Sequence, residues 1–112
     1  MNMAQKEGVL KMPATIGEAD ILNYLMKTGP ISLADLAFRF DDPPRVLRAL
    51  SGLKEREEVD IDQAGVLEQI IHQIDQIPAP QMLEGSYNVL RDTPEAKSVV
   101  RLTGRGFRKA AG

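Results

Sequence analysis

The chain has 112 residues, with 14 lysines and arginines against 16 aspartates and glutamates, and this length predicts a single domain. Cysteine is absent and there is one histidine, which excludes disulfide scaffolds, thiol catalysis and Cys- or multi-His metal sites, so we expect neither an enzyme nor a cofactor. No apolar run approaches the ~20 residues of a membrane span and no secretory leader is recognisable, so we expect a cytoplasmic protein without membrane contact.

The N-terminal residues differ in character from the rest of the chain. Residues 1–14 show little pattern and are expected to form a flexible arm, whereas 15–112 are expected to form the domain. Thr15-Ile16-Gly17-Glu18 has the spacing of a capping box and predicts the start of a first helix. Gly29-Pro30 predicts its end.

Two more helices follow in close succession. Ser32, with Asp35 three residues later, predicts a helix start, and its position leaves a second role open, a phosphate site on the free amides. An acidic residue before proline in Asp41-Asp42-Pro43-Pro44 predicts a third helix, from about Pro43 to Arg56. Residues 15–57 are therefore expected to form a three-helix core that contains a helix-turn-helix.

The middle of the chain combines a strand with an amphipathic helix. Alternation in Val59-Asp60-Ile61-Asp62 predicts a short strand, and helical spacing of apolar residues predicts an inserted helix at about 64–77. The apolar stripe of this helix is wide enough to pack on its own chain, on a second copy, or on both. The residues expected at a homodimer interface are Leu67, Ile70, Ile71, Ile74 and Ile77.

The C-terminal part is expected to contain two strands. Tyr87–Arg91 and Ser98–Thr103 have strand composition, with a turn at Asp92–Glu95 between them. It is open whether 59–61, 87–91 or both pair with the last strand. Residues 105–112 are expected to be a tail ending in a turn or short helix.

Two segments resemble the winged-helix transcription regulators. GPISLADLAFRFDDPPRVLRALSGLKEREEVDI (29–61) resembles their helix-turn-helix, and YNVLRDTPEAKSVVRLTGRGFRKA (87–110) resembles the wing of the MarR and PadR groups. In that wing a second strand ends in Leu-Thr-x-x-Gly, here Leu102-Thr103-Gly104-Arg105-Gly106. The resemblance implies a mainly α fold with a small β-hairpin (α+β), a winged helix-turn-helix with its wing at 86–104 and the helix at 64–77 as an addition.

The resemblance also implies sequence-specific binding of duplex DNA by a small, dimeric transcriptional regulator. Its third helix would enter the major groove, with Leu47 at a position that faces DNA. The contacts expected from this helix are Arg45, Arg48, Ser51 and Lys54. The contacts expected from the wing and tail are Arg91, Lys97, Arg101, Arg105, Arg108 and Lys109.

The distribution of charge supports an alternative function. Between Glu55 and Asp75 there are seven acidic residues against one arginine, whereas 97–112 contains five basic residues and no acidic one. DNA would avoid an acidic face at 55–75, which better suits a protein partner. The alternative is a winged-helix adaptor for protein–protein interaction in a larger assembly, without DNA binding.

Overall fold

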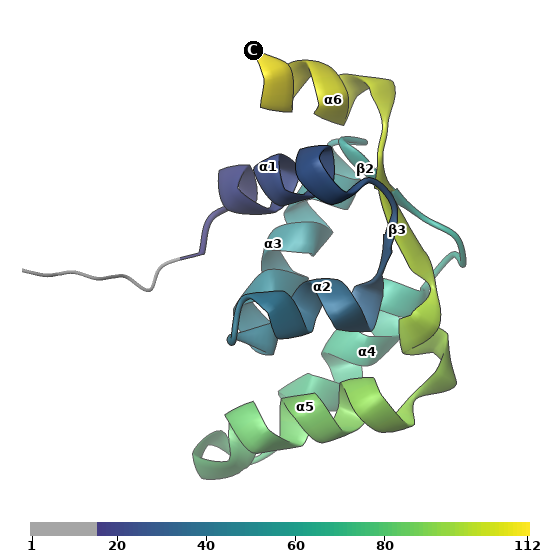
Figure 1. The fold of residues 1–112 in the computed structure, drawn as a ribbon. Helices are drawn as coiled ribbons and strands as arrows, with labels where there is room; N and C mark the ends of the chain where they lie inside the picture. Colours follow the sequence, from purple (N-terminus) through teal and green to yellow (C-terminus); the bar gives the residue numbers. More distant parts are fainter. Residues whose placement is uncertain (1–15) are drawn as a thin grey trace, which may run out of the picture.

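The computed structural model describes residues 16–112 as six α-helices and one three-stranded antiparallel sheet (Figure 1). Residues 1–15, with the expected arm and Thr15 of the expected capping box, lie outside the described residues. The helices are α1 (Glu18–Thr28), α2 (Leu33–Arg39), α3 (Pro43–Glu55), α4 (Val66–Asp75), α5 (Met82–Asp92) and α6 (Gly104–Ala111). The strands are β1 (Ile31–Ser32), β2 (Val59–Ile61) and β3 (Val99–Leu102). The expected mainly helical chain with a small β element is thus confirmed.

Local sequence signals explain where α2 and α3 begin. The hydroxyl of Ser32 accepts the Asp35 N–H at 3.1 Å, and the Asp42 carboxylate accepts the Arg45 N–H at 3.4 Å. Each side chain satisfies an amide that has no partner within the first turn of its helix. Both helices were predicted, and α3 ends within one residue of the expected boundary.

The sheet joins segments that are far apart in the chain. Its order is β1-β3-β2, and both outer strands run antiparallel to β3. Val59 faces Leu102, and Val100 lies between Ile61 on one side and Ile31 on the other. The expected strand at 59–61 therefore pairs with the last strand. β1 was not predicted, because a two-residue strand is too short to show alternation.

The segment Tyr87–Arg91 is helical, so the predicted strand there is wrong. It forms the second half of α5, and a short 3₁₀ helix, Pro94–Lys97, leads from α5 to β3. The wing expected over 86–104 is accordingly wrong as well, since this stretch supplies one strand and not a hairpin. The connection between β2 and β3 instead carries α4 and α5.

Close packing by small residues explains the error in α5. Gly85 lies under Ile77, whose Cδ1 would be 2.8 Å from a Cβ at this position. Ser86 is fully buried, and its hydroxyl donates to the Met82 carbonyl at 2.6 Å. A glycine followed by a serine is typical of a turn, but here both lie inside one continuous helix, and Gly85 makes room for Ile77 in the segment that connects α4 to α5.

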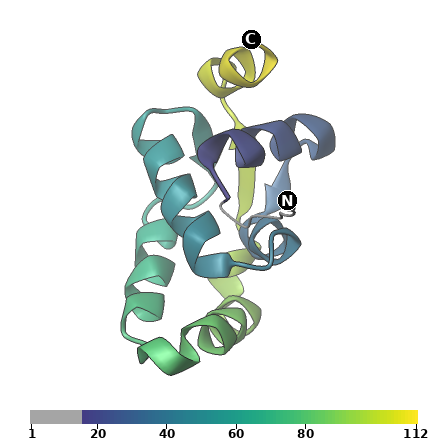
Figure 2. The same ribbon diagram turned by 90° about the vertical axis from the view of Figure 1, so that its left-hand side faces the viewer.

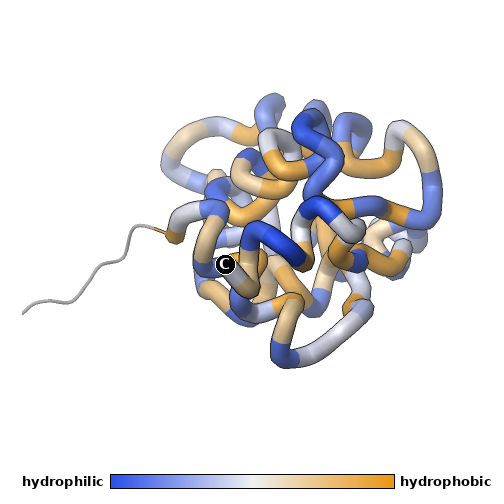
Figure 3. The backbone as a smooth tube through the Cα atoms, turned by 90° about the horizontal axis from the view of Figure 1, so that it is seen from above, coloured by the Kyte–Doolittle hydropathy of each residue, from blue (hydrophilic) through white to orange (hydrophobic). Residues whose placement is uncertain are grey.

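One hydrophobic core lies between the sheet and the helices, with α4 and α5 closing it on the side away from α6 (Figure 1). Hydrophobic and hydrophilic stretches alternate along the tube in Figure 3, as expected for helices that bury one face. In the part of the chain that the structure describes, no helix combines the length and the apolar character needed to cross a bilayer.

Candidate functional site

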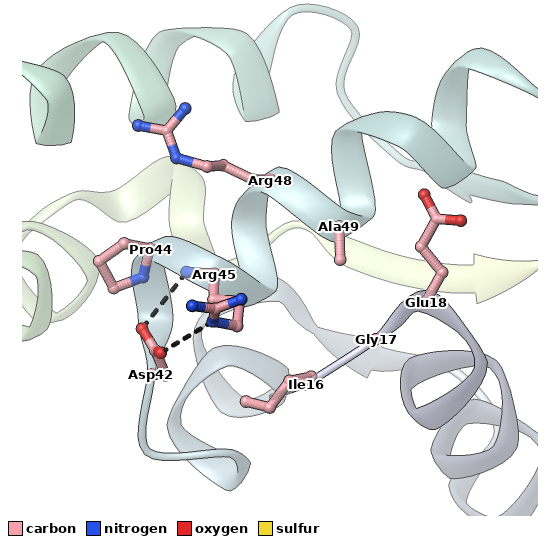
Figure 4. A pocket seen from close by; sticks show the side chains of 8 residues that line it. All are labelled: Ile16, Gly17, Glu18, Asp42, Pro44, Arg45, Arg48 and Ala49. Carbon is pink, nitrogen blue, oxygen red and sulfur yellow. Dashed lines mark hydrogen bonds and ion pairs between the residues drawn. The ribbon is translucent and has the colours of Figure 1, made fainter. Parts of the chain in front are cut away.

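The exposed side of α3 carries two of the arginines expected to bind DNA. The side chains of Arg45 and Arg48 are 51% and 60% exposed, and their spacing of three places them on one side of the helix. Both border an open groove of about 490 Å³ between the start of α1 and the first half of α3 (Figure 4). The groove is lined by Ile16, Gly17, Glu18, Asp42, Pro44, Arg45, Arg48 and Ala49.

Each arginine of the groove is held by a carboxylate. Arg45 Nε lies 3.3 Å from Asp42 Oδ2, and Arg48 pairs with Asp75 of α4. In Figure 4 the Arg48 side chain is turned away from that of Arg45. At the α1 side of the groove Glu18 pairs with Arg56, and this hydrogen bond holds the pKa of Glu18 below its usual value. The formal charges that line the groove, two of each sign, cancel.

A second side of α3, expected to face DNA, is covered by α4. Leu47 is only 1% exposed, so its predicted outward position is wrong. It packs with Pro44 and with Ile71 and Ile74 of α4, and the space between these side chains is too small for a water molecule. α4 thus occupies the position that the resemblance would leave open to DNA (Figure 2).

The covering helix also binds one of the two remaining expected contacts of α3, Lys54. Ser51 is half-buried, and Lys54 Nζ donates to Glu68 Oε2 at 3.2 Å. The α4 carboxylates that hold Arg48 and Lys54 lie 27 and 14 residues further along the chain. Helical spacing in the sequence does not reveal these partners, because it shows only neighbours three or four residues apart.

The apolar stripe of α4 is used within the chain. Leu67, Ile70 and Ile74 are fully buried in its own core, against α3 and α5, so they present no surface to a second copy. Ile71 and Ile77 are half-buried. Core packing, one of the two roles left open for this helix, is therefore observed, and a dimer through α4 stays a prediction.

The cations expected on the wing and tail do not form one surface. Arg91 lies on α5 and Arg101 on β3, whereas the other members of the group lie in the 3₁₀ helix or on α6, namely Lys97, Arg105, Arg108 and Lys109. α5 and α6 are at opposite ends of the molecule (Figure 1). The predicted tail at 105–112 is mostly helix, packed against α1.

Folding also brings the basic and acidic stretches of the sequence together. Arg101 Nη1 lies 2.5 Å from Asp62 Oδ1, and Lys109 Nζ lies 3.2 Å from Oε2 of the buried Glu58. The carboxylates in 55–75 that have a basic partner are Glu58, Asp60, Asp62, Glu68 and Asp75. The acidic face expected at 55–75 is therefore largely neutralised by the chain itself.

The hydroxyl of Ser32 is engaged in capping α2, as described above. A phosphate would have to use the remaining amides of this seven-residue helix, so the phosphate role stays a prediction. Within residues 16–112 no group of three or more His, Asp or Glu side chains is arranged to hold a metal ion.

No protein-family model matches the chain, and no curated protein or solved structure shows significant similarity to it. Function must therefore be inferred from the geometry of the chain itself. The main feature of that geometry is the open groove between α1 and α3, whose charges balance, while another side of α3 is covered by α4.

Proposed function

We propose that this chain is a winged-helix interaction module that binds another protein and does not contact DNA bases through α3. The order α1-β1-α2-α3-β2-β3, with β3 between the other two strands, supports the winged-helix assignment. In this interpretation the helical pair α4 and α5 stands between β2 and β3, where a winged helix carries its wing.

The observation that carries this proposal is the packing of α4 on α3. The major groove of B-DNA is about 12 Å wide and a helix with its side chains is about 10–12 Å across, so the groove admits one helix. α4 is packed directly against α3 at Leu47. The α3–α4 pair is therefore too broad to enter the major groove of DNA with the Leu47 side of α3 facing the bases.

Removing α4 would be costly. It would expose Leu47 of α3 together with Ile70 and Ile74 of α4, which are all almost completely buried. Each buried side chain of this size contributes roughly 1.5–3 kcal/mol. The sum approaches the total stability of about 5–15 kcal/mol that is typical of a domain. We therefore expect α4 to stay on α3 in the folded protein.

The groove that remains open suits a protein better than a polyanion. Asp42 and Asp75 hold the two arginines, and Glu18 lines the opposite wall. A phosphate backbone would meet these carboxylates as well as the cations. Protein interfaces, by contrast, combine arginine with apolar and polar groups, and Ile16 and Pro44 supply apolar area here.

Binding to duplex DNA tests the negative part of the proposal. Fluorescence anisotropy with a short labelled duplex of random sequence is measured at about 50 and about 200 mM salt. We expect weak binding that is the same for the wild type and for Arg45→Ala/Arg48→Ala. Lys27→Ala/Arg39→Ala removes the same charge at exposed positions away from the groove, at residues not expected to contact DNA, and is the matched control. Tight, salt-sensitive binding lost only in the Arg45→Ala/Arg48→Ala variant would overturn the proposal.

Retention of a partner protein tests the positive part. The immobilised full chain is incubated with extract that has been treated with nuclease, and retained proteins are then purified and tested as binary pairs. We expect a pair that forms with the wild type and with Lys27→Ala/Arg39→Ala, and that weakens at least about tenfold with Arg45→Ala/Arg48→Ala. Proteins retained from untreated extract but not from nuclease-treated extract would contradict direct protein binding and would indicate that nucleic acid bridges them to the chain.

A further inference from the structure

The most exposed large apolar side chains among the described residues are Phe107 and Leu83, at 54% and 51% exposure. Phe107 lies on α6 and Leu83 on α5. Figures 1 and 2 both place these helices at opposite ends of the molecule. Single exposed apolar side chains are common on protein surfaces, but an exposed apolar patch rimmed by polar residues is typical of a protein interaction site.

The outer side of α6 is basic. Gly106 faces inward, where a Cβ would overlap the carbonyl oxygen of Glu58, and Lys109 pairs with the carboxylate of Glu58. These two contacts fix the rotation of α6 and leave Arg105, Phe107 and Arg108 exposed, a surface called here the α6 face. Arg105 Nη1 donates to the Arg56 carbonyl at 3.2 Å, and within residues 16–112 neither arginine of this face pairs with a carboxylate.

The exposed side of α5 combines apolar and acidic groups. Tyr87 stacks on Phe38 of α2 with 5.5 Å between ring centroids, and Leu83 lies one helical turn away on the same side of α5. Asp41 lies beside the phenol of Tyr87, where it adds to the effect of burial in raising the pKa of this group. Glu84 is exposed next to Leu83. These five residues are called the α5 face.

The charges of the α5 face are free to meet a partner. In the described part of the chain, Asp41 and Glu84 have no basic partner within ion-pair distance, whereas most carboxylates of 55–75 do. Among residues 16–112, Phe107 is thus an exposed apolar side chain bordered by arginines, and Leu83 is one bordered by carboxylates.

We propose that the α6 face of one molecule binds the α5 face of a second copy. Phe107 would pack on Leu83 and Tyr87, because aromatic side chains pack well on such surfaces. The arginines of the α6 face would pair with Asp41 and Glu84. Because the two faces differ and lie at opposite ends, this contact is heterologous and adds copies head to tail, as an open chain or a larger ring.

The opposite signs of the two faces favour a second copy over another partner. A copy of the chain provides both the apolar centre and the charges that each face lacks, in a single surface. None of the residues of either face lines the groove between α1 and α3. Head-to-tail association and the proposed function therefore depend on different residues, and each can be disproved without affecting the other.

Sedimentation velocity of the full chain over a range of concentrations tests the proposal. The average mass of the wild type is expected to rise beyond a dimer with concentration and to fall as salt is added, because salt screens exposed charges. Phe107→Ala/Arg108→Ala and Leu83→Ala/Glu84→Ala are each expected to weaken association at least about tenfold. Met26→Ala/Lys27→Ala removes an exposed apolar and a basic side chain from α1 and is the matched control, expected to behave as the wild type.

Mixing the two defective variants distinguishes head-to-tail association from a symmetric dimer. Each variant keeps one intact face, so the mixture is expected to form a dimer of one copy of each and to stop there. A wild type that stays monomeric at millimolar concentration would overturn the proposal. So would association limited to a dimer in the wild type, or association that neither variant weakens. Circular dichroism of each variant checks that it is folded.

Discussion

Leu47→Ala is expected to destabilise the chain substantially, because α4 covers this side chain. Leu47 is 1% exposed, and no water-sized space separates it from Ile71 and Ile74. The substitution removes three carbon groups, worth about 0.8 kcal/mol each, or about 2.4 kcal/mol together. The cavity left behind adds to this value, and Leu→Ala changes in cores cost about 2–5 kcal/mol. We expect a loss of about 3 kcal/mol.

Urea denaturation followed by far-UV circular dichroism measures this loss. With a slope of about 1–3 kcal/mol per molar urea, a loss of about 3 kcal/mol lowers the midpoint by roughly 1–3 M. Arg45→Ala, at an exposed position of the same helix, is the control and is expected to change stability by less than about 0.5 kcal/mol. A change of that small size for Leu47→Ala would show that α4 does not cover α3. That side of α3 would then be open to DNA bases, contrary to the proposed function.

Two further results are expected. Gly106→Ala should lower the thermal unfolding midpoint, because its Cβ has no room beside Glu58, whereas Gly104→Ala, where the nearest atom would be 3.6 Å away, should not. Tyr87 is expected to ionise above pH 10.0, because burial, and to a smaller extent the charge of Asp41, raises the pKa of its phenol. A pH titration of phenolate absorbance, compared between the wild type and Tyr87→Phe, measures this ionisation. The stability that the neutral Tyr87 phenol contributes is fully present below the pKa of this group in the unfolded chain, and it is lost as the pH rises through its pKa in the folded chain. Ionisation at or below pH 10.0 would contradict the position of Tyr87 beside Phe38 and Asp41.

The elements predicted well from sequence are those fixed by neighbours in the chain. α2 and α3 follow from caps at Ser32 and Asp42, which act within three residues. β2 follows from alternation around Asp60, and α4 from the helical spacing of its apolar residues. In each case the interaction that specifies the element is local, so a single sequence contains it.

The elements predicted wrongly depend on contacts between distant segments. In α5 the absence of a side chain at Gly85 is explained only by Ile77, which leaves no room for a Cβ there. The burial of Leu47 depends on a helix that begins nineteen residues later, at Val66. A signal for it was present, since α3 has an apolar residue outside its core stripe and α4 has a stripe wider than a dimer requires. Two apolar surfaces of one chain that have no other partner are expected to pack against each other and so leave water.

The distribution of charge along the sequence is a poor guide to the charged surfaces of the folded chain. The basic C-terminal stretch and the acidic middle stretch predict two surfaces, but Arg101 and Lys109 reach Asp62 and Glu58 across 39 and 51 residues. Glu58 is buried in the second pair, whereas exposed ion pairs such as Arg101–Asp62 contribute little to stability, about 0–1 kcal/mol each. They matter for binding instead, because a phosphate must displace a carboxylate from each paired cation before it gains a contact. Arg105 and Arg108 of the α6 face form no ion pair within residues 16–112, and neither do Asp41 and Glu84 of the α5 face. Helices α6 and α5 lie at opposite ends of the molecule (Figure 1).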